Sequence, residues 1–194
     1  MDFKKLANQY RDELLDNVLP FWLEHSQDIE FGGYFSCLDR EGKVFDTDKF
    51  IWLQGREVWM FSMLYNKVEK RQEWLDCAVQ GGEFLKKYGH DGNYNWYFSL
   101  DRSGRPLVEP YNIFSYTFAT MAFGQLSLAT GNQEYADIAK KTFKIILSKV
   151  DNPKSKWNKL HPGTRNLKNF ALPMILCNLA LEIEHLLDPG YLEQ

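Results

Sequence analysis

The chain has 194 residues, of which 44% are hydrophobic and 25% are charged, and its formal net charge is -3. This length and composition are enough to bury a substantial core, in one domain or in part of a larger one. The slightly acidic balance offers no basic stripe of the kind that binds phosphates, so we expect no nucleic-acid partner.

The start of the chain and its cysteines both indicate a cytoplasmic protein. Residues 1–5 lead directly into a polar amphipathic pattern, without a signal-peptide core or an apolar run long enough to span a bilayer, so we expect no membrane partner. The cysteines are odd in number and widely spaced, at Cys37, Cys77 and Cys177. We interpret them as reduced core thiols rather than as disulfide partners or metal ligands.

The first predicted element is an amphipathic helix over residues 3–24. Apolar side chains recur along it at spacings of three and four residues, which is the period of one helix face. These positions are Phe3, Leu6, Tyr10, Leu14, Val18, Phe21 and Trp22. Pro20 is expected to kink or shorten the end of this helix, because proline lacks an N–H and crowds the preceding turn.

A short β-hairpin and a buried helix are predicted next. Residues 32–38 and 43–45 flank a polar turn that Gly42 closes. Thr47 or Asp48 can cap the following helix. This helix is apolar on most of its sides, and the residues that make it so are Ile51, Trp52, Val58, Trp59, Met60, Met63 and Leu64.

The same succession then recurs at an offset of 62 residues. An outer helix with charges on one face is predicted over residues 72–88, and a second hairpin over 94–108. Its turn places Asp101 and Gly104 each 62 positions after Asp39 and Gly42. A nearly all-apolar helix over about 112–129 follows, and Asn132 caps another helix that begins with a similar sequence. A repeated unit of this length indicates stacked helical hairpins.

The third copy is looser than the first two. A polar loop over residues 151–165 replaces the hairpin, a nearly all-apolar helix covers 170–187, and a seventh helix should begin at Tyr191. Three amphipathic helices therefore alternate with three apolar ones, as an outer and an inner ring would require.

We accordingly predict an all-α fold, an αα-hairpin toroid of the (α/α)6 barrel type with short β-hairpins. Three units make about half a barrel, which we expect to form a single domain over residues 1–194. Inner helices that are apolar on every side would leave a large exposed patch. We therefore expect self-association or pairing with a missing half.

Trp52, Arg56 and Trp59 share one face of the second helix, at spacings of four and three residues. An arginine on a buried apolar face is costly unless it is paired. Either Arg56 forms an ion pair with a carboxylate such as Glu57, or it is a donor aimed into the cavity of the ring. The flanking rings and Gly55, which allows close helix packing, favour the second interpretation.

No acid or base for catalysis stands out in the sequence. The four histidines, His25, His90, His161 and His185, lie at a helix end, in polar loops or on a polar helix side, and we interpret them as surface residues. The sequence shows no metal-ligand spacing, no phosphate-binding glycine loop and no nucleophile elbow. We therefore predict that the inner helices provide a ligand-binding surface, with neither a metal site nor an identified catalytic residue.

Residues 49–60, which include the run Trp52-Leu53-Gln54-Gly55-Arg56, resemble the N-acylglucosamine 2-epimerase family, and 113–115 and 172–176 support this. The resemblance covers essentially the whole chain. It implies an (α/α)6 barrel of roughly twice this length. It also implies reversible epimerisation at C2 of an amino sugar, interconverting N-acetylglucosamine and N-acetylmannosamine by removal and return of a proton.

The resemblance also implies roles for individual residues. Arg56 occupies the position of a substrate-facing arginine, which would bind a sugar oxygen and stabilise enolate charge. Trp52 and Trp59 are implied for the sugar-facing wall. Phe114 and Ile175 stand where cellobiose epimerases carry a tyrosine and a histidine, which favours the acylglucosamine branch.

The catalytic pair of the family consists of histidines in the C-terminal half, and none of the four histidines here matches them. We therefore expect the chain alone to be inactive. No cofactor is required, although ATP is a candidate effector because some members of this branch respond to nucleotides. The alternatives are a non-catalytic carbohydrate-binding or self-associating module and, third, a glycoside hydrolase, which would need paired acidic residues.

Overall fold

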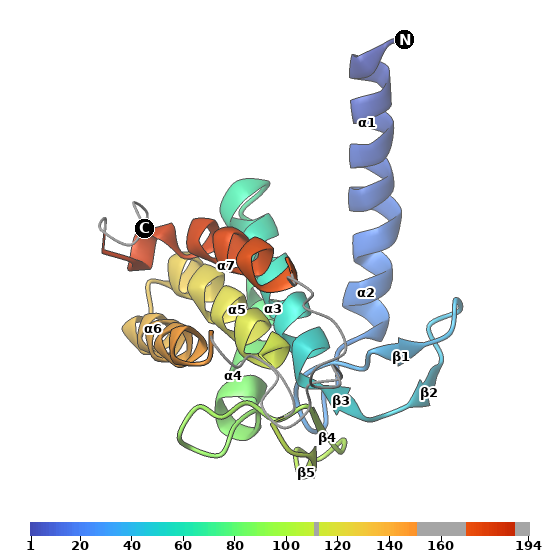
Figure 1. Ribbon diagram of the computed structural model, residues 1–194. Coiled ribbons are helices and arrows are strands. Elements are labelled where there is room, and N and C mark those ends of the chain that lie inside the picture. The colour runs from blue at the N-terminus through green and yellow to red at the C-terminus, as the bar shows by residue number, and fades with distance from the viewer. Residues whose placement is uncertain (111–112, 151–169, 189–194) are drawn as a thin grey trace, which may run out of the picture.

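Two layers of helices make up most of this computed structural model (Figure 1). The inner helices α3 (Ile51–Lys67), α5 (Phe114–Thr130) and α7 (Ala171–Glu182) lie side by side, and the outer helices α4 (Gln72–Tyr88) and α6 (Gln133–Ser148) pack against α3 and α5. The structure describes residues 1–110, 113–150 and 170–188. The alternation of inner and outer helices is the arrangement predicted for a partial αα toroid.

The two central inner helices approach each other closely at Gly55. A Cβ atom built at Gly55 would lie 2.9 Å from the backbone carbonyl carbon of Phe118 on α5. Small residues such as Ala119 and Ala122, both 0% exposed, occupy the buried side of α5. Because the helix backbones approach this closely, the face of α3 that carries Arg56 is held at a fixed angle to α5.

The first predicted helix is formed in three parts. α1 (Phe3–Glu13) passes through a π-helical turn, η1 (Leu14–Val18), into α2 (Leu19–His25). Pro20 crowds the carbonyl of Asp16 and cannot donate to it, so the chain widens locally and the N–H of Leu19 bonds to the Leu14 carbonyl instead. Of the two effects predicted for Pro20, shortening is wrong, because the helix continues to His25, and the irregularity is the π-helical turn just before the proline.

α1 projects away from the other helices (Figure 1). None of its residues is buried, and Phe3 and Tyr10 are 74% and 70% exposed. The predicted amphipathic pattern is present, but nothing in the described part of the chain covers its apolar face. Such an uncovered face on a helix is typical of an interaction surface.

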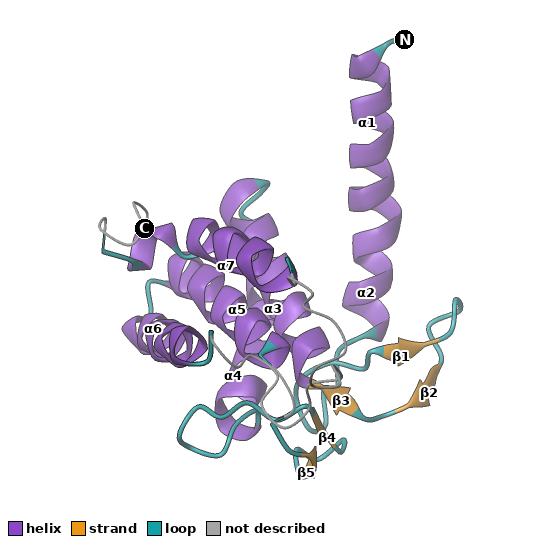
Figure 2. Cartoon of the chain, in the orientation of Figure 1, coloured by secondary structure: helices purple, strands orange, loops and turns teal. Residues whose placement is uncertain are grey.

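Two β-hairpins and one additional strand lie at one end of the helices (Figure 2). β1 (Cys37–Leu38) pairs with β2 (Val44–Asp46), and β4 (Ser99–Leu100) pairs with β5 (Pro106–Val108), as predicted. The sequence did not predict β3 (Lys49–Phe50), which pairs with β4 and makes a three-stranded sheet.

The start of α3 also differs from the prediction. Neither Thr47 nor Asp48 caps the helix, because both precede β3 and Phe50 occupies the cap position without a side-chain bond. The first helical N–H, that of Ile51, instead donates to the carbonyl of Phe98, at 3.0 Å. A residue of the second hairpin therefore completes the first inner helix. The predicted cap at Asn132 is confirmed, since its side chain accepts from the N–H of Glu134.

The repeat predicted from the sequence is reproduced in the structure. α3 and α5 both contain 17 residues. In the turns, the N–H of Asp39 donates to the carbonyl of Lys43, and the N–H of Asp101 donates to that of Arg105. Each hairpin also carries a register shift at the same position of its first strand. The first two units are therefore built alike, down to individual backbone hydrogen bonds.

The third unit is less complete. The helix predicted over residues 170–187 ends at Glu182 and is followed by a short 3-10 helix, η3 (Glu184–Leu186). Only Leu179 of α7 is buried, whereas Met174 and Leu181 are 55% and 69% exposed. One side of this apolar helix is therefore uncovered by described residues. The predicted loop over 151–165, the helix start at Tyr191 and the residue Asn112 lie outside the described residues.

The three cysteines differ in burial. All three cysteines are free, but only Cys77 is a core thiol, since Cys37 is half-buried and Cys177 is exposed. No helix in the described ranges has the length and apolar run needed to cross a membrane.

Candidate functional site

Arg56 lies on α3, where its exposed guanidinium faces two aromatic rings. The guanidinium carbon is 5.3 Å from the ring centre of Phe118 and 5.9 Å from that of Trp52, which are distances of cation–π contacts. No carboxylate of the described residues forms an ion pair with it. The interpretation of Arg56 as a buried partner of Glu57 is therefore wrong, because Arg56 is exposed and Glu57 points elsewhere.

Glu57 is almost completely buried, with 9% of its surface exposed. Its Oε1 atom lies 2.5 Å from the hydroxyl oxygen of Ser26 at the end of α2, and that oxygen lies 2.6 Å from the carbonyl of Trp22. Burial raises the pKa of Glu57 to about 8, although the hydrogen bond with Ser26 opposes this.

Ser26 has one hydroxyl proton for these two oxygens. The Ser26 hydroxyl lies within donating distance of both, and a neutral Glu57 removes the competition between them for this proton. Burial therefore favours the neutral form of Glu57 near neutral pH. Arg56 is the one basic side chain among the described residues that line the adjoining hollow.

The hollow has a volume of about 290 Å³ and lies between α2, the segment before β1 and α3. Seven residues line it: Trp22, Ser36, Leu53, Arg56, Glu57, Trp59 and Met60. The hydroxyl of Ser36 is buried and has no hydrogen-bond partner among the described residues. A mostly apolar wall with a few converging polar groups is the usual composition of a small-molecule site.

The structure brings together only some of the residues predicted for the site. Arg56 and Trp59 line the hollow, whereas Trp52 lies outside it and packs against Phe118 at a ring-centre distance of 6.2 Å. Phe114 is the half-buried first residue of α5 and also lies outside the hollow. The sequence reasoning missed Ser36 and the burial of Glu57 against Ser26, since neither is recognisable before the packing of α2 on α3 is known.

Trp59 is positioned by a residue of α7. Its indole Nε1 donates to Oε2 of Glu182 at 2.9 Å, and the Gln125 amide of α5 donates to the same oxygen at 3.0 Å. Glu182 therefore connects all three inner helices at one point. Since this bond uses the indole N–H, Trp59 presents only its ring to a ligand. A charge at the end of an otherwise apolar helix was the only sequence signal for Glu182.

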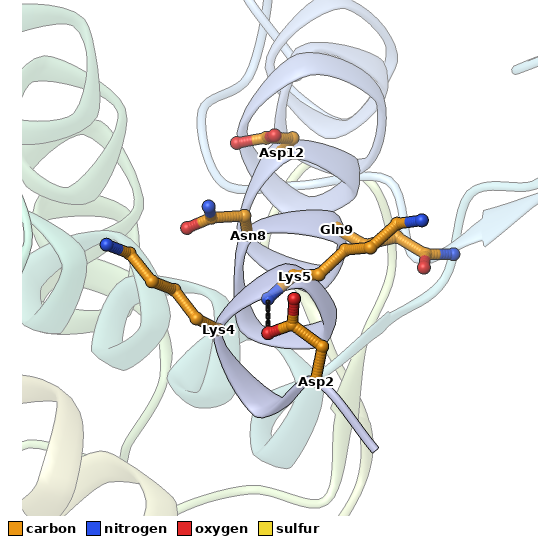
Figure 3. A pocket seen from close by; sticks show the side chains of 6 residues that line it. All are labelled: Asp2, Lys4, Lys5, Asn8, Gln9 and Asp12. Carbon is orange, nitrogen blue, oxygen red and sulfur yellow. Dashed lines mark hydrogen bonds between the residues drawn. The ribbon is translucent and has the colours of Figure 1, made fainter.

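A second hollow, along α1, does not have the properties of a ligand site. Figure 3 shows the six side chains that line it, all from α1 and its cap, and Lys4 and Lys5 point away from each other. The bond drawn there is the helix cap, in which the N–H of Lys5 donates to Asp2 at 3.0 Å. Because these groups do not converge, we regard the hollow as ordinary helix surface.

The described histidines do not line the hollow beside Arg56. The ring of His25 packs on Phe21, and His90 accepts a bond from the N–H of Gly92. Nε2 of His185 lies 3.1 Å from the carbonyl of Gly124. His161 lies outside the described residues. Within the described ranges, no three histidine, cysteine or acidic residues are placed to hold a metal ion.

Comparison with known sequences identifies similar proteins over most of the chain. Residues 33–194 match the family model N-acylglucosamine 2-epimerase (GlcNAc 2-epimerase). The N-acylglucosamine 2-epimerase of Bos taurus is 41% identical over 174 residues, which cover 87% of this chain and 41% of the bovine protein. The cellobiose 2-epimerase of Dictyoglomus turgidum is 30% identical over 148 residues, covering 75% of this chain and 38% of that protein.

The fold is similar to that of solved sugar epimerases. The cellobiose 2-epimerase from Bacillus thermoamylovorans aligns with a TM-score of 0.81 at 23% identity, covering 98% of this chain and 54% of that chain. The predicted αα-toroid fold, present in part, is therefore confirmed. The chain spans less than half the length of the curated relatives described above. The family match and the sequence identities together show that the chain belongs to the N-acylglucosamine 2-epimerase family.

Proposed function

We propose that this chain supplies one half of a sugar 2-epimerase that interconverts N-acetylglucosamine and N-acetylmannosamine. The observation that carries the proposal is Arg56, which stands beside the hollow on aromatic rings, with no carboxylate partner among the described residues. The acylglucosamine branch is favoured because the bovine relative of that name is 41% identical, against 30% for the cellobiose 2-epimerase.

The proposed chemistry gives Arg56 a specific task. Epimerisation at C2 of an open-chain sugar removes the proton next to the aldehyde, which moves negative charge onto the aldehyde oxygen. A guanidinium that is not already neutralised can donate to that oxygen and stabilise the enolate. A planar donor held on rings keeps its direction, so little reorganisation is needed as the charge develops.

The proton itself must be moved by groups that this chain is not expected to supply. None of the described histidines lines the hollow, and Glu57 is buried and bonded to Ser26. We therefore propose that the bases come from a second half of the ring. The uncovered apolar faces of α1 and α7 support this, because they lie on the first and the last described helices of the arc.

The proposal can be tested by co-expressing the 194-residue chain with the C-terminal part of the bovine relative that it does not match. We expect interconversion of the two N-acetylhexosamines by the pair and none by the chain alone. Arg56→Ala should lower kcat/KM by a factor of about 100 or more, since it removes a donor to the developing charge. Arg71→Ala is the matched control, because Arg71 also stacks on a tryptophan but lies outside the hollow.

Two results would overturn this proposal. Turnover by the chain alone would require a base among its own residues. An unchanged rate in the Arg56→Ala variant would remove the assigned donor. If the chain alone instead bound N-acetylglucosamine in calorimetry, and the pair showed no turnover, the non-catalytic carbohydrate-binding module would be the better description.

A further inference from the structure

The second hairpin shows how one unit of this fold docks onto the unit before it. β4 pairs with β3, with Leu100 opposite Lys49 and Ser99 opposite Phe50. Next to this pairing, the carbonyl of Phe98 accepts the first N–H of α3. The edge of the hairpin therefore extends the strand of the preceding unit and also caps its inner helix.

An arginine in the turn of the same hairpin strengthens this docking. Arg102 donates from Nε and Nη2 to the two carboxylate oxygens of Asp28, at 3.0 and 3.1 Å. Its carbonyl accepts from Nζ of Lys49 at 2.9 Å. Asp28 and Lys49 are both 0% exposed and form an ion pair at 2.9 Å. The arginine of one unit therefore completes a buried charge cluster in the unit before it.

The first hairpin has the same construction. Its pairings, Cys37 with Asp46 and Leu38 with Val44, correspond to those of the second hairpin at an offset of 62 residues. Its turn glycine, Gly42, packs against the His25 ring at the end of α2, as Gly104 packs against Tyr88 at the end of α4.

Two residues of the first hairpin occupy the docking positions. Arg40 stands 62 positions before Arg102, and Ser36 stands 62 positions before Phe98. Their placement follows from the shared register of the two hairpins. The first hairpin therefore contains a counterpart of each group with which the second hairpin contacts the unit before it.

The first hairpin nevertheless has no docking partner in the described chain. β1 pairs only with β2, in a two-stranded sheet. The side chain of Arg40 is 91% exposed, whereas that of Arg102 is 37% exposed. Leu38 is half-buried, whereas its counterpart Leu100 is fully buried. The difference in exposure falls on the positions that contact the preceding unit in the second hairpin.

We propose that the free edge of β1, together with Arg40, is a docking surface for a further unit of the same repeat. That unit would supply an extended residue pair to β1 and a buried aspartate to Arg40. The N–H at the start of its inner helix would donate to the carbonyl of Ser36. This inference rests on the ring-completion part of the proposed function and specifies its contacts.

The occupant is the remainder of a longer ring rather than a second copy of this chain. The chain covers 41% of the bovine relative and 54% of the solved cellobiose epimerase, so both contain further chain of the length that three more units need. In this structure Arg40 forms an ion pair with the neighbouring Glu41 at 2.8 Å, and Glu41 is 66% exposed. Ion pairs exposed to this extent contribute little to stability, so Arg40 can readily exchange Glu41 for another partner.

The experiment uses the 194-residue chain co-expressed with the tagged C-terminal part of the bovine relative, and the dissociation constant of the purified pair is measured. Arg40→Glu should weaken binding about tenfold or more, because it places like charges together. Lys43→Glu is the matched control in the same turn. Its counterpart Arg105 pairs within its own turn, with Asp101 at 2.6 Å, so this variant should bind within about twofold of the parent.

A second measurement follows the backbone. Hydrogen exchange at the β1 amides should slow on complex formation, since a paired edge protects its N–H groups. Failure of the parent pair to copurify, or equal binding by the Arg40→Glu and Lys43→Glu variants, would overturn the proposal. So would a homodimer of the chain that Arg40→Glu dissociates, since the occupant would then be a second copy. Binding is measured without turnover, so an inactive pair that shows the Arg40 effect refutes only the catalytic proposal.

Discussion

Nε1 of Trp59 on α3 donates to Oε2 of Glu182 on α7 at 2.9 Å, so the first inner helix is tied directly to the third. Gln125 on α5 donates to the same oxygen. Trp59, which lines the hollow, is therefore oriented by a carboxylate of another unit. The same carboxylate connects all three inner helices at this point.

Glu182→Ala should lower the free energy of unfolding by about 1–3 kcal/mol, because it leaves the half-buried indole N–H of Trp59 without an acceptor. The Gln125 amide loses one of its two bonds and keeps the one to the backbone carbonyl of residue 182. Urea denaturation measures this difference. Glu184→Ala removes an equal charge from an exposed position two residues away and should change stability by less than about 0.5 kcal/mol. Equal losses in the two variants would mean that the bond to Trp59 contributes nothing.

Glu57 should make stability depend on pH. Its pKa rises from its usual 4.5 to about 8 on folding, so the folded state keeps a proton that the unfolded chain releases. Between these pH values the free energy of unfolding should therefore fall as pH rises, by up to about 1.4 kcal/mol per pH unit, and the contribution is fully present only below the lower pKa.

Glu57→Gln is the control for this effect, since the amide stays neutral and its oxygen can still accept from Ser26. Urea denaturation of both proteins between about pH 5 and about pH 8 gives the difference, in which the shared contributions of His90 and His185 cancel. The advantage of the parent over the variant should shrink steadily with rising pH. Parallel curves would show that Glu57 is already ionised in the folded protein.

Asp28→Asn should be among the most destabilising single changes, at about 3–5 kcal/mol, because it leaves the fully buried ammonium of Lys49 without its counter-charge. Burial favours the neutral carboxyl, but bonds from Arg102 and Lys49 more than offset this and lower the pKa of Asp28. The contribution of the Asp28 charge should therefore be lost as the pH falls through that lowered pKa.

Glu30→Gln tests the same cluster at its surface. Glu30 pairs with Arg102 at 3.0 Å but is 64% exposed, so this substitution should cost less than about 0.5 kcal/mol. Thermal unfolding of both variants at neutral pH measures the two losses of stability. A cost for Asp28→Asn as small as that for Glu30→Gln would mean that Lys49 is neutral or finds another partner.

Gly55→Ala should destabilise the chain by about 1–3 kcal/mol, although alanine favours helices, because its Cβ would press on the backbone of Phe118. Circular dichroism during urea denaturation measures the loss. Since the obstruction is mainly backbone, adding Phe118→Ala should not restore stability. Recovery in the double variant would show that the side chain sets the helix spacing.

The helices were predicted well, because the pattern that indicates each one lies within its own segment of the sequence. Residues 72–88 were predicted as a helix and α4 has these bounds, because its apolar period and flanking polar residues lie within the segment itself. The repeat likewise required only a comparison of the chain with itself. β3 and the capping of α3 were missed, because both depend on Phe98 and β4, which lie far along the sequence.

The site was predictable only in part, for the same reason. The family resemblance singled out Arg56, but its exposure depends on the angle between α3 and α5. The state of Glu57 depends on Ser26, 31 residues earlier, and nothing in the local sequence marks that contact. The assigned sugar-binding roles of Trp52 and Phe114 remain predictions, since both lie outside the hollow.

The bond from the N–H of Ile51 to the carbonyl of Phe98 has a consequence for the order of folding. During synthesis, the start of the first inner helix emerges 47 residues before the group that caps it. Until the second hairpin has been made, the first unit therefore lacks three contacts. These are the bond at the start of α3, the pairing of β3 with β4, and the bond from Lys49 to the carbonyl of Arg102. Folding of the first unit should therefore be completed only after the second hairpin has been synthesised, because that hairpin supplies these contacts.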